Sequence, residues 1–568
     1  MTTSISFLLQ MNVQVSPTVD VTLLVMHRKI GIKDYPENRI KYNLRKHILE
    51  NIAPIHYPII HCPAIESYLP KLIYAQFPLV FITHFKLVAV WSFFERVLNE
   101  KLQSPYRFLE TEPVKPIVEI YNPGFMLYRS ILLLAFLVQF CFHSSCQEPN
   151  SAKLIIANVN VIPLYKDTIL KGMDVVIENG RIKEVKQHVA RGQGQLRKGL
   201  FINGTGKYLI PALIDCHVHY GSDAALFQSY DSLYFLYGVV KVLALNGTPQ
   251  VLEHRDNIQK GLAYGPGIKC SGPRVNDSNM TALQAKELLQ RLKMAGYDFV
   301  KIYSDLSKEG FDQISREARA YGLRILGHMP QRVTTSGVLH SNQELIAHAE
   351  EFMYNPPVNY FMGNIKTPEK PNPVYIPALA DSVKFYQKAV SPTLIAYKSI
   401  LQSAVNLDAY VKTVPLSLSH PVSIAWQWSK EASFIPKKFN SSLSISRLQF
   451  GYEYQLKLVG AFYKAGVLLL AGTDAPTLPG LIPGHSLHLE IQLLREAGLS
   501  NYEALKAATI NPAYFLKIHS DFGTIEVGKE ASLLLLNKNP LQNISNTLEI
   551  ESVFLKGQQL KREVGKDK

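Results

Sequence analysis

Residues 209–219 read Leu-Ile-Pro-Ala-Leu-Ile-Asp-Cys-His-Val-His, an apolar run that ends in two histidines one residue apart. Because alternate side chains of a strand point to the same face, His217 and His219 are expected to project together from the carboxyl end of a strand. Two imidazoles on one face suit zinc or another borderline divalent metal. A pair of surface or core histidines would give the same pattern, so the neighbouring sequence has to decide between these interpretations.

Short apolar runs rich in β-branched residues continue beyond this stretch and alternate with helical segments up to about Pro512. The runs are residues 239–245, 268–271, 299–303, 324–328 and 467–471, and residues 390–394 supply a further strand, the seventh. Such alternation over about 300 residues predicts a parallel sheet, and its length suits a TIM (β/α)8 barrel. A doubly wound open sheet is the alternative, but the chain has no GxGxxG loop to support it.

One helical segment shows the pattern clearly. Ala282–Ala295 carries leucines at helical spacing and is followed by Gly296, a residue that commonly ends helices. Leu283, Leu288, Leu289 and Leu292 are expected near one face of it. In contrast, residues 355–450 are longer than one strand and one helix require, and we expect helices and loops there that cover the barrel mouth, where substrate choice is decided.

The segments on either side of the barrel have the character of strands. Residues 154–162 and 173–177 are strand-like, and Asn179-Gly180 marks a hairpin turn because both residues tolerate a positive φ. Strands are expected again after the barrel, in the segments 523–529, 531–536 and 552–555. We therefore expect a small β-sandwich built from residues 152–212 plus 513–562, beside a barrel of residues 213–512.

Four further polar residues stand where barrel strands are expected to end. Lys301, His328, His348 and Asp474 each close or directly follow an otherwise apolar run. Each has an ordinary structural explanation taken singly, since a lysine can extend to solvent and a histidine or an aspartate can cap a helix. Their occurrence at successive strand ends, where barrel enzymes place catalysis, makes coincidence a poor explanation.

At this point the sequence resembles the amidohydrolase superfamily, and within it the imidazolonepropionase-like amidohydrolases and zinc-dependent Xaa-Pro dipeptidases. The similarity covers roughly residues 152–562, and one departure is Ala212, where the family usually has glycine. The motifs that carry it are Asp215-Cys-His217-Val-His219, Asp298-Phe-Val-Lys-Ile302, Gly327-His328, Ala347-His348-Ala-Glu-Glu351 and Ala471-Gly-Thr-Asp474-Ala475, followed by residues 483–490, 505–512 and 523–531.

The resemblance implies a binuclear site with two divalent metal ions, most simply zinc. His217, His219 and Asp474 would hold one ion and His328 and His348 the other. Lys301 would bridge both as a carbamate, because an ammonium group cannot bind a cation. A hydroxide between the metals would attack the amide carbonyl of a cyclic amide or a dipeptide. Asp474 would act as general base and then as general acid.

Alternative functions and three less well supported site residues remain open. A deaminase or a lactonase on the same scaffold is the first alternative; a non-catalytic binding member is less favoured because all six ligand positions are kept. Three further side chains are weak candidates for contact with the substrate, namely Tyr303, Tyr220 and His485.

The composition and the N-terminal region give the remaining expectations, which concern partners and localisation. The net charge of +14 comes from basic residues spread along the chain, and without a nucleic-acid-binding motif we expect no nucleic-acid partner. Residues 126–146 resemble a secretory signal or a lipoprotein signal that ends at Cys146. Residues 1–125 would then lie upstream of the natural start at Met126. These features predict an exported enzyme, periplasmic or tethered to a membrane by lipid in a bacterium, that acts on a small molecule or dipeptide and forms a homo-oligomer.

Overall fold

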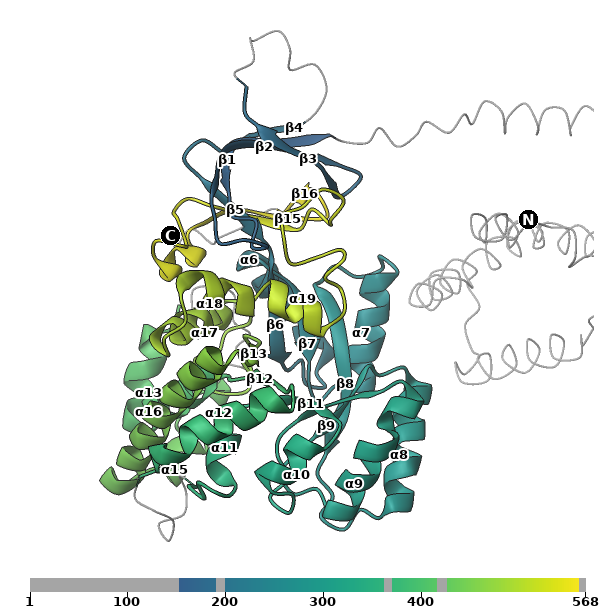
Figure 1. Ribbon diagram of the computed structural model, residues 1–568, viewed down its shortest axis with the longest axis vertical. Coiled ribbons are helices and arrows are strands. Elements are labelled where there is room, and N and C mark those ends of the chain that lie inside the picture. Colours follow the sequence, from purple (N-terminus) through teal and green to yellow (C-terminus); the bar gives the residue numbers. More distant parts are fainter. Residues whose placement is uncertain (1–152, 190–199, 362–369, 416–425, 561–568) are drawn as a thin grey trace, which may run out of the picture. The chain divides into compact units, whose positions relative to one another are not determined.

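The computed structural model describes residues 153–189, 200–361, 370–415 and 426–560, which all belong to one compact unit spanning Ile131–Lys568 (Figure 1). The expected signal at residues 126–146, with Cys146, and the upstream residues 1–125 lie outside the described residues. In the described ranges, no helix combines the length and the apolar character needed to cross a bilayer.

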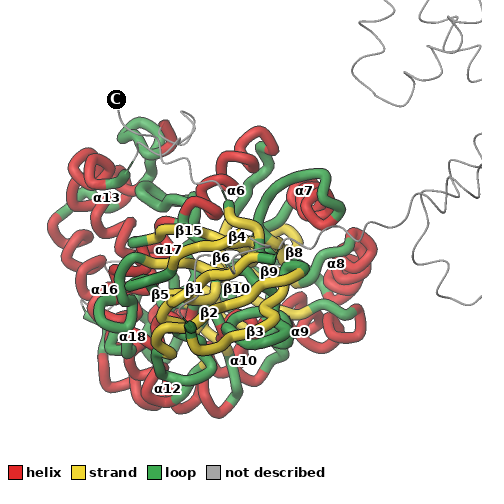
Figure 2. The backbone as a smooth tube through the Cα atoms, turned by 90° about the horizontal axis from the view of Figure 1, so that it is seen from above, coloured by secondary structure: helices red, strands yellow, loops and turns green. Residues whose placement is uncertain are grey.

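A parallel sheet of eight strands, paired in chain order, forms the larger part of the unit. Its strands are β6 (Leu213–Val218), β7 (Val239–Ala244), β8 (Gly267–Val275), β9 (Phe299–Ile302), β10 (Arg324–Gly327), β11 (Gln343–Ala347), β12 (Ala389–Ser391) and β13 (Leu468–Leu469). The amide of Cys216 donates to the carbonyl of Ala471 at 2.9 Å, and that of His219 to Ala475 at 2.8 Å, so the first strand also pairs with the segment after the last. The predicted TIM-like barrel is confirmed, and helices surround its strands (Figure 2).

Helices connect the barrel strands. They are α6 (Phe227–Leu236), α7 (Pro249–Gln259), α8 (Ala282–Ala295), α9 (Lys308–Glu317), α10 (Thr335–His340), α11 (Glu351–Tyr354), α12 (Ile376–Phe385), α13 (Leu394–Thr413), α15 (Ile435–Lys438), α16 (Ser442–Ala465), α17 (His485–Glu496), α18 (Asn501–Ala507) and α19 (Ile510–Phe515), with 3-10 turns at 224–226, 318–321, 373–375 and 544–548.

The predicted helix α8 has the expected bounds, because a capping box closes its start and Gly296 ends it with a φ of 85°. Leu289 and Leu292 are buried, but Leu283 is 67% exposed. The expectation that Leu283 shares the buried face is therefore wrong. Leu283 stands in the first turn of the helix, where its side chain points to solvent rather than to the barrel.

The long segment before β13 builds most of one flank of the barrel. α12 precedes β12, which is the seventh strand of the barrel as predicted. The remaining helices, α13, α15 and α16, pack on one another, with α13 in contact with both of the others. The side chains of α13 and α16 reach the cavity at the carboxyl ends of the strands.

A second, mixed sheet combines residues from before and after the barrel. Its order is β16-β15-β14-β5-β1-β2-β3, with β4 also paired to β1. The strands are β1 (Leu154–Val161), β2 (Leu170–Glu178), β3 (Arg181–Gln187), β4 (Leu200–Asn203), β5 (Tyr208–Pro211), β14 (Leu533–Leu536), β15 (Ile550–Leu555) and β16 (Gln558–Gln559). β5 ends two residues before β6 begins, so this sheet adjoins the amino end of the first barrel strand, away from the strand ends that carry the histidines (Figure 1).

The turns of the mixed sheet follow the sequence only in part. Asn179 and Gly180 join β2 to β3 with φ angles of 53° and 73°, as the hairpin prediction requires. The segment 523–529, predicted as a strand, is instead irregular. It lies against β3, where the amide of Gly528 donates to the carbonyl of Ile182 at 2.8 Å, and it closes a core that contains Ile156, Val175 and Leu533.

Candidate active site

The carboxyl ends of the barrel strands bring the six predicted ligands around one cavity of about 360 Å³. β6 carries His217, and His219 follows it directly; Lys301 lies within β9. His328, His348 and Asp474 come from the segments that follow β10, β11 and β13, respectively. Convergence on one cavity follows from the parallel order, because the carboxyl ends of all eight strands meet at the same end of the barrel.

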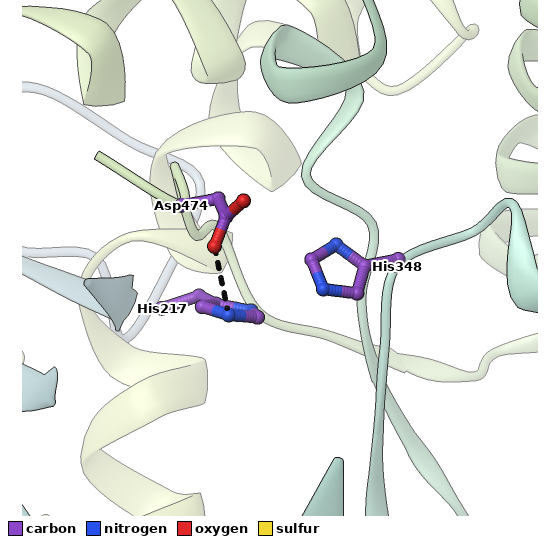
Figure 3. A group of neighbouring side chains, drawn as sticks. All are labelled: His217, His348 and Asp474. Atoms are coloured by element: carbon purple, nitrogen blue, oxygen red, sulfur yellow. Dashed lines mark ion pairs between the residues drawn. The ribbon is translucent and has the colours of Figure 1, made fainter. Parts of the chain in front are cut away.

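Two of these side chains, His217 and His219, lie close to one carboxylate oxygen of Asp474. Oδ1 of Asp474 lies 2.8 Å from Nε2 of His219 and 3.2 Å from Nε2 of His217 (Figure 3 shows the pair with His217). Both ring nitrogens of His217 are buried without an aligned hydrogen bond among the described residues. Burial, with the charge of Lys301, lowers the pKa of His217 to about 3, so its ring is neutral at ordinary pH.

This arrangement fits a divalent metal ion. One ligand atom each from His217, His348 and Asp474 lies within 4.8 Å of the others (Figure 3). Burial opposes a charged Asp474, but the neighbouring His219 and His217 outweigh that cost and hold its pKa well below the usual range. Neutral imidazoles beside a carboxylate are donors that zinc-like ions prefer, and a cation would compensate the crowded carboxylate.

Hydrogen bonds fix the orientation of the other two histidines. The hydroxyl of Thr393 donates to the carbonyl of Pro392 at 2.8 Å and lies 2.6 Å from Nδ1 of His348. Since that hydroxyl proton is already used, Nδ1 of His348 is the donor, and its Nε2 keeps a free lone pair. Nδ1 of His328 lies 2.7 Å from Oε1 of Glu351, which fixes the ring of His328 in the same way.

Lys301 is a buried amine at the site. Its side chain is 1% exposed, and its Nζ has no hydrogen-bond partner among the described residues. Burial lowers the pKa of Lys301 to about 8, although the charges of Asp474 and Glu351 act against this shift. A buried amine without a partner is costly for an unmodified lysine and easily gives up its proton.

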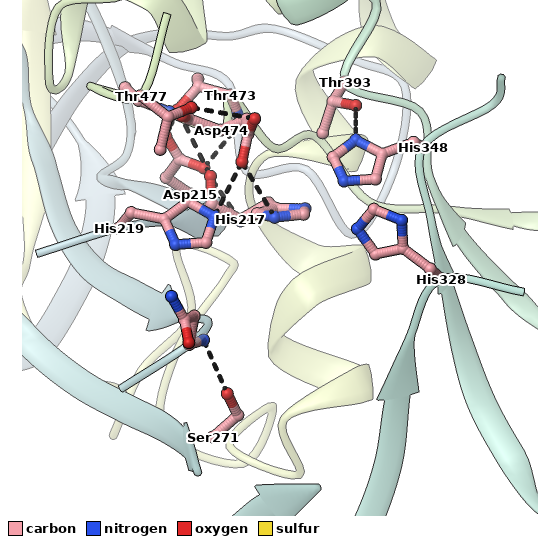
Figure 4. A network of polar contacts seen from close by, with 12 residues as sticks. Asp215, His217, His219, Ser271, His328, His348, Thr393, Thr473, Asp474 and Thr477 are labelled. Atoms are coloured by element: carbon pink, nitrogen blue, oxygen red, sulfur yellow. Dashed lines mark hydrogen bonds and ion pairs between the residues drawn. The ribbon is translucent and has the colours of Figure 1, made fainter. Parts of the chain in front are cut away.

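Asp215 ties the first strand of the barrel to the last segment of the site. Its Oδ1 accepts the amides of His217 and Thr473, and its Oδ2 accepts the hydroxyl of Thr473 at 2.7 Å (Figure 4). The backbone of Asp474 has a φ of 62°, a strained conformation for a residue other than glycine, and its amide donates to the carbonyl of His217 at 2.7 Å. Asp215 and Thr473 therefore hold two of the predicted ligands in register.

The structure places the three weaker candidates for substrate contact in three different surroundings. Tyr303 lines the cavity, with its ring centroid 4.2 Å from that of His328. Tyr220 is buried, its hydroxyl donates to Asp231 at 2.8 Å, and it does not line the cavity. His485 begins α17 and lines a different cavity, together with Lys398, so the structure does not bring it to the predicted ligands.

Several cavity residues were not anticipated from the sequence. On one side stand Asn246 and Arg274, whose guanidinium carbon lies 5.0 Å from the ring centroid of Tyr303. From the sixth and seventh strands and the helices after them come further lining residues, which are Glu350, Thr393, Ala396, Tyr397, Ile400, Phe434 and Gln455. Only Glu350 stands in a recognised motif; the others have no local sequence signal.

A (β/α)8 barrel with this donor set at its strand ends defines a hydrolytic enzyme class. The sequence model described as "Amidohydrolase family" matches residues 456–560 of this chain. That match covers the end of the barrel and the return to the mixed sheet, including Asp474.

Similar proteins extend this picture. A 5-methylthioadenosine/S-adenosylhomocysteine deaminase from Caldanaerobacter subterraneus subsp. tengcongensis is 24% identical over 413 residues, which are 68% of this chain and 85% of the relative. A solved structure described as a prolidase from Bifidobacterium longum is 23% identical with a TM-score of 0.52, covering 72% of this chain and 95% of the other. A Xaa-Pro dipeptidase with methionine bound in its active site is 17% identical with a TM-score of 0.54, covering 72% and 100%. The two structural likenesses show the shared fold.

Proposed function

We propose that the chain is a metal-dependent hydrolase that cleaves the C–N bond of an amide in a dipeptide or a cyclic amide. The observation that carries this proposal is the convergence of four buried or half-buried histidines, one carboxylate and one buried lysine without a partner on a single cavity. Likeness to a prolidase and a Xaa-Pro dipeptidase supports an amide substrate rather than a lactone.

We further propose two divalent ions, most simply zinc, held by His217, His219 and Asp474 on one side and by His328 and His348 on the other. Such ions lower the pKa of water and polarise a carbonyl oxygen. Lys301 would be carboxylated on Nζ, and the resulting carbamate would be an anionic ligand for both ions. The unpartnered, buried Nζ supports this, because a neutral amine reacts with carbon dioxide and an ammonium group does not.

Asp474 is the proposed proton carrier. Its Oδ1 faces His217 and His219, and its Oδ2 accepts the hydroxyl of Thr477 at 3.0 Å, so the carboxylate is held over the cavity (Figure 4). In that position it takes a proton from the attacking water and passes it to the leaving amine. Arg274 and Tyr303 line the cavity side by side and offer a cation and a hydroxyl to a substrate carboxylate.

A deaminase is the second candidate, favoured by the named activity of the relative from Caldanaerobacter. The test is a panel of dipeptides, cyclic amides and 5′-methylthioadenosine, assayed for both amine and ammonia release on the zinc-loaded full chain. The proposal expects cleavage of dipeptides or cyclic amides without ammonia release from the nucleoside. Ammonia release alone would contradict it and support the deaminase.

Export remains a further proposal, which rests on the sequence of residues 126–146. We propose that cleavage before Cys146 and attachment of lipid there tether the enzyme to a membrane, and that it forms a homo-oligomer. Mass spectrometry of the protein from its native membrane fraction would test the tether. A diacylglyceryl-modified peptide beginning at Cys146 is expected, and abundant peptides from residues 1–125 would contradict the expected start at Met126.

A further inference from the structure

Phe434 lines the active-site cavity, and 54% of its surface is exposed. Its neighbours in the chain fix its position, since Ser433 and Ile435 are 5% and 0% exposed. The amide of Lys438 also donates to the carbonyl of Phe434 at 3.0 Å, in the turn that forms α15. A single exposed aromatic side chain on a protein surface needs no explanation. One that buried neighbours hold at the edge of a cavity is available to a ligand.

Three other apolar side chains continue this side of the cavity. Ala396 and Ile400 stand one helical turn apart on α13 and therefore share a face of that helix, which packs against α15. Leu478 follows β13, the last barrel strand, and also lines the cavity. Ile400 and Leu478 pack against the barrel core but remain partly accessible. Together with Phe434, these residues form what we call the apolar wall.

The surroundings of the apolar wall offer no charge to a substrate. Apart from the six predicted ligands, the ionisable acids and bases that line the cavity are Arg274, Tyr303 and Glu350. Oε2 of Glu350 is closed to solvent, and burial raises the pKa of this carboxyl group to about 8, so it is protonated at neutral pH. A substrate ammonium group would lose its hydration at the wall without gaining an ion pair. An apolar group would gain by leaving water.

The barrel places the apolar wall and Arg274 at opposite ends of the cavity. Arg274 stands near the end of β8, the third barrel strand, whereas α13 follows β12, the seventh strand. The third and seventh strands of an eight-stranded barrel lie across from each other. The predicted ligands come from the first, fourth, fifth, sixth and eighth strands, which occupy both arcs between them. A bond that reacts at these ligands therefore has Arg274 on one side and the apolar wall on the other.

We propose that the apolar wall is a specificity subsite, in which Phe434 selects substrates that carry a large, uncharged apolar group on the side of the scissile bond away from Arg274. This inference rests on the proposed amide hydrolysis, and it adds the residue that decides between a bulky apolar group and a small or charged one. Removal of a phenyl-sized group from water corresponds to a gain in affinity of roughly 10- to 100-fold.

The test uses binding, so that it does not depend on turnover. The probes are the alkene isosteres of N-acetylglycine, N-(phenylpropanoyl)glycine and β-alanylglycine, which cannot be hydrolysed, titrated calorimetrically into the zinc-loaded full chain. Wild type should bind the phenylpropanoyl isostere at least about tenfold more tightly than the acetyl isostere, and the cationic β-alanyl isostere no more tightly. Phe434→Ala should lower the phenylpropanoyl-to-acetyl ratio at least about threefold, and Phe434→Leu, which keeps an apolar side chain, should largely restore it.

A matched control separates the subsite from a general effect of losing an exposed ring. Phe385 on α12 is 77% exposed and does not line the cavity, so Phe385→Ala should keep the wild-type ratio. All three variants should keep the zinc content and the unfolding midpoint of wild type, because each changed side chain is largely exposed and is no predicted ligand.

The proposal would be overturned by a wild-type ratio near one, by no binding of the phenylpropanoyl isostere, or by tighter binding of the β-alanyl isostere than of the acetyl isostere. A ratio that Phe434→Ala leaves unchanged, or that Phe385→Ala lowers equally, would overturn it too. Hydrolysis of the three parent amides, assayed in parallel, tests the proposed function separately. The expected binding ratios without any hydrolysis would support the subsite and contradict amide cleavage.

Discussion

Glu490 on α17 offers a test of how this helix supports the start of α13, next to the site. Its side chain is fully buried, and its Oε2 accepts the amide of Ile395 at 2.8 Å in the first turn of α13. α13 begins directly after Thr393, whose hydroxyl orients His348. The perturbation is Glu490→Gln, which removes the charge and keeps a carbonyl oxygen to accept the Ile395 amide.

The expected magnitude follows from the pKa of the buried carboxyl. Burial raises the pKa of Glu490 from 4.5 to about 8, against the backbone amides that lower it. A folded-state pKa above the unfolded value means that stability is fully present below pH 4.5 and is lost as the pH rises through about 8. At about 1.4 kcal/mol per pKa unit, wild type loses on the order of 5 kcal/mol across this window relative to a variant without the charge.

The assay is urea unfolding of wild type and Glu490→Gln between pH 4.5 and 9, with a chelator present so that metal binding does not contribute. The difference between the two free energies of unfolding isolates residue 490, since other titrating groups cancel. The free energy of unfolding of Glu490→Gln, relative to that of wild type, should increase steadily as the pH rises. A difference that stays constant over the whole window would refute the reasoning.

Three further changes probe the site. Glu351→Gln removes the carboxylate that orients His328, so metal affinity measured by chelator competition should fall about 10- to 100-fold, and an unchanged affinity would count against that role. Asp474→Asn should lower the rate of hydrolysis at saturating metal by about 100-fold or more, and wild-type turnover would exclude it as the proton carrier. Gly451→Ala, where the new Cβ meets the Tyr397 hydroxyl, should lower the free energy of unfolding by about 1–3 kcal/mol in urea titrations. A stabilisation by Gly451→Ala, as an open helical position would give, would show that the packing there is loose.

The polar residues at the strand ends were predictable because their sequence signals are local. Lys301 and His328 stand out as polar residues that end short apolar runs, and a parallel barrel necessarily brings such ends together. The hairpin at Asn179 and Gly180 was predictable for the same reason, since both residues carry the turn conformation themselves.

The substrate side of the cavity was not predictable, because it depends on packing between distant segments. Tyr397 and Gln455 lie 58 positions apart on two helices, and each contacts Gly451. His485 shows the opposite failure. Its place after the last strand suggested an approach to the substrate, but the direction in which α17 leaves the barrel puts it in another cavity.

The central claim is that Lys301 bridges two metal ions, and metal content tests it most directly. Plasma mass spectrometry on the full chain and on Lys301→Ala, each reconstituted with zinc under bicarbonate and freed of excess metal, gives the stoichiometry. The account predicts about two ions per chain in wild type and a sharp fall in the variant. About one ion per chain, unaffected by Lys301→Ala, would contradict the bridge.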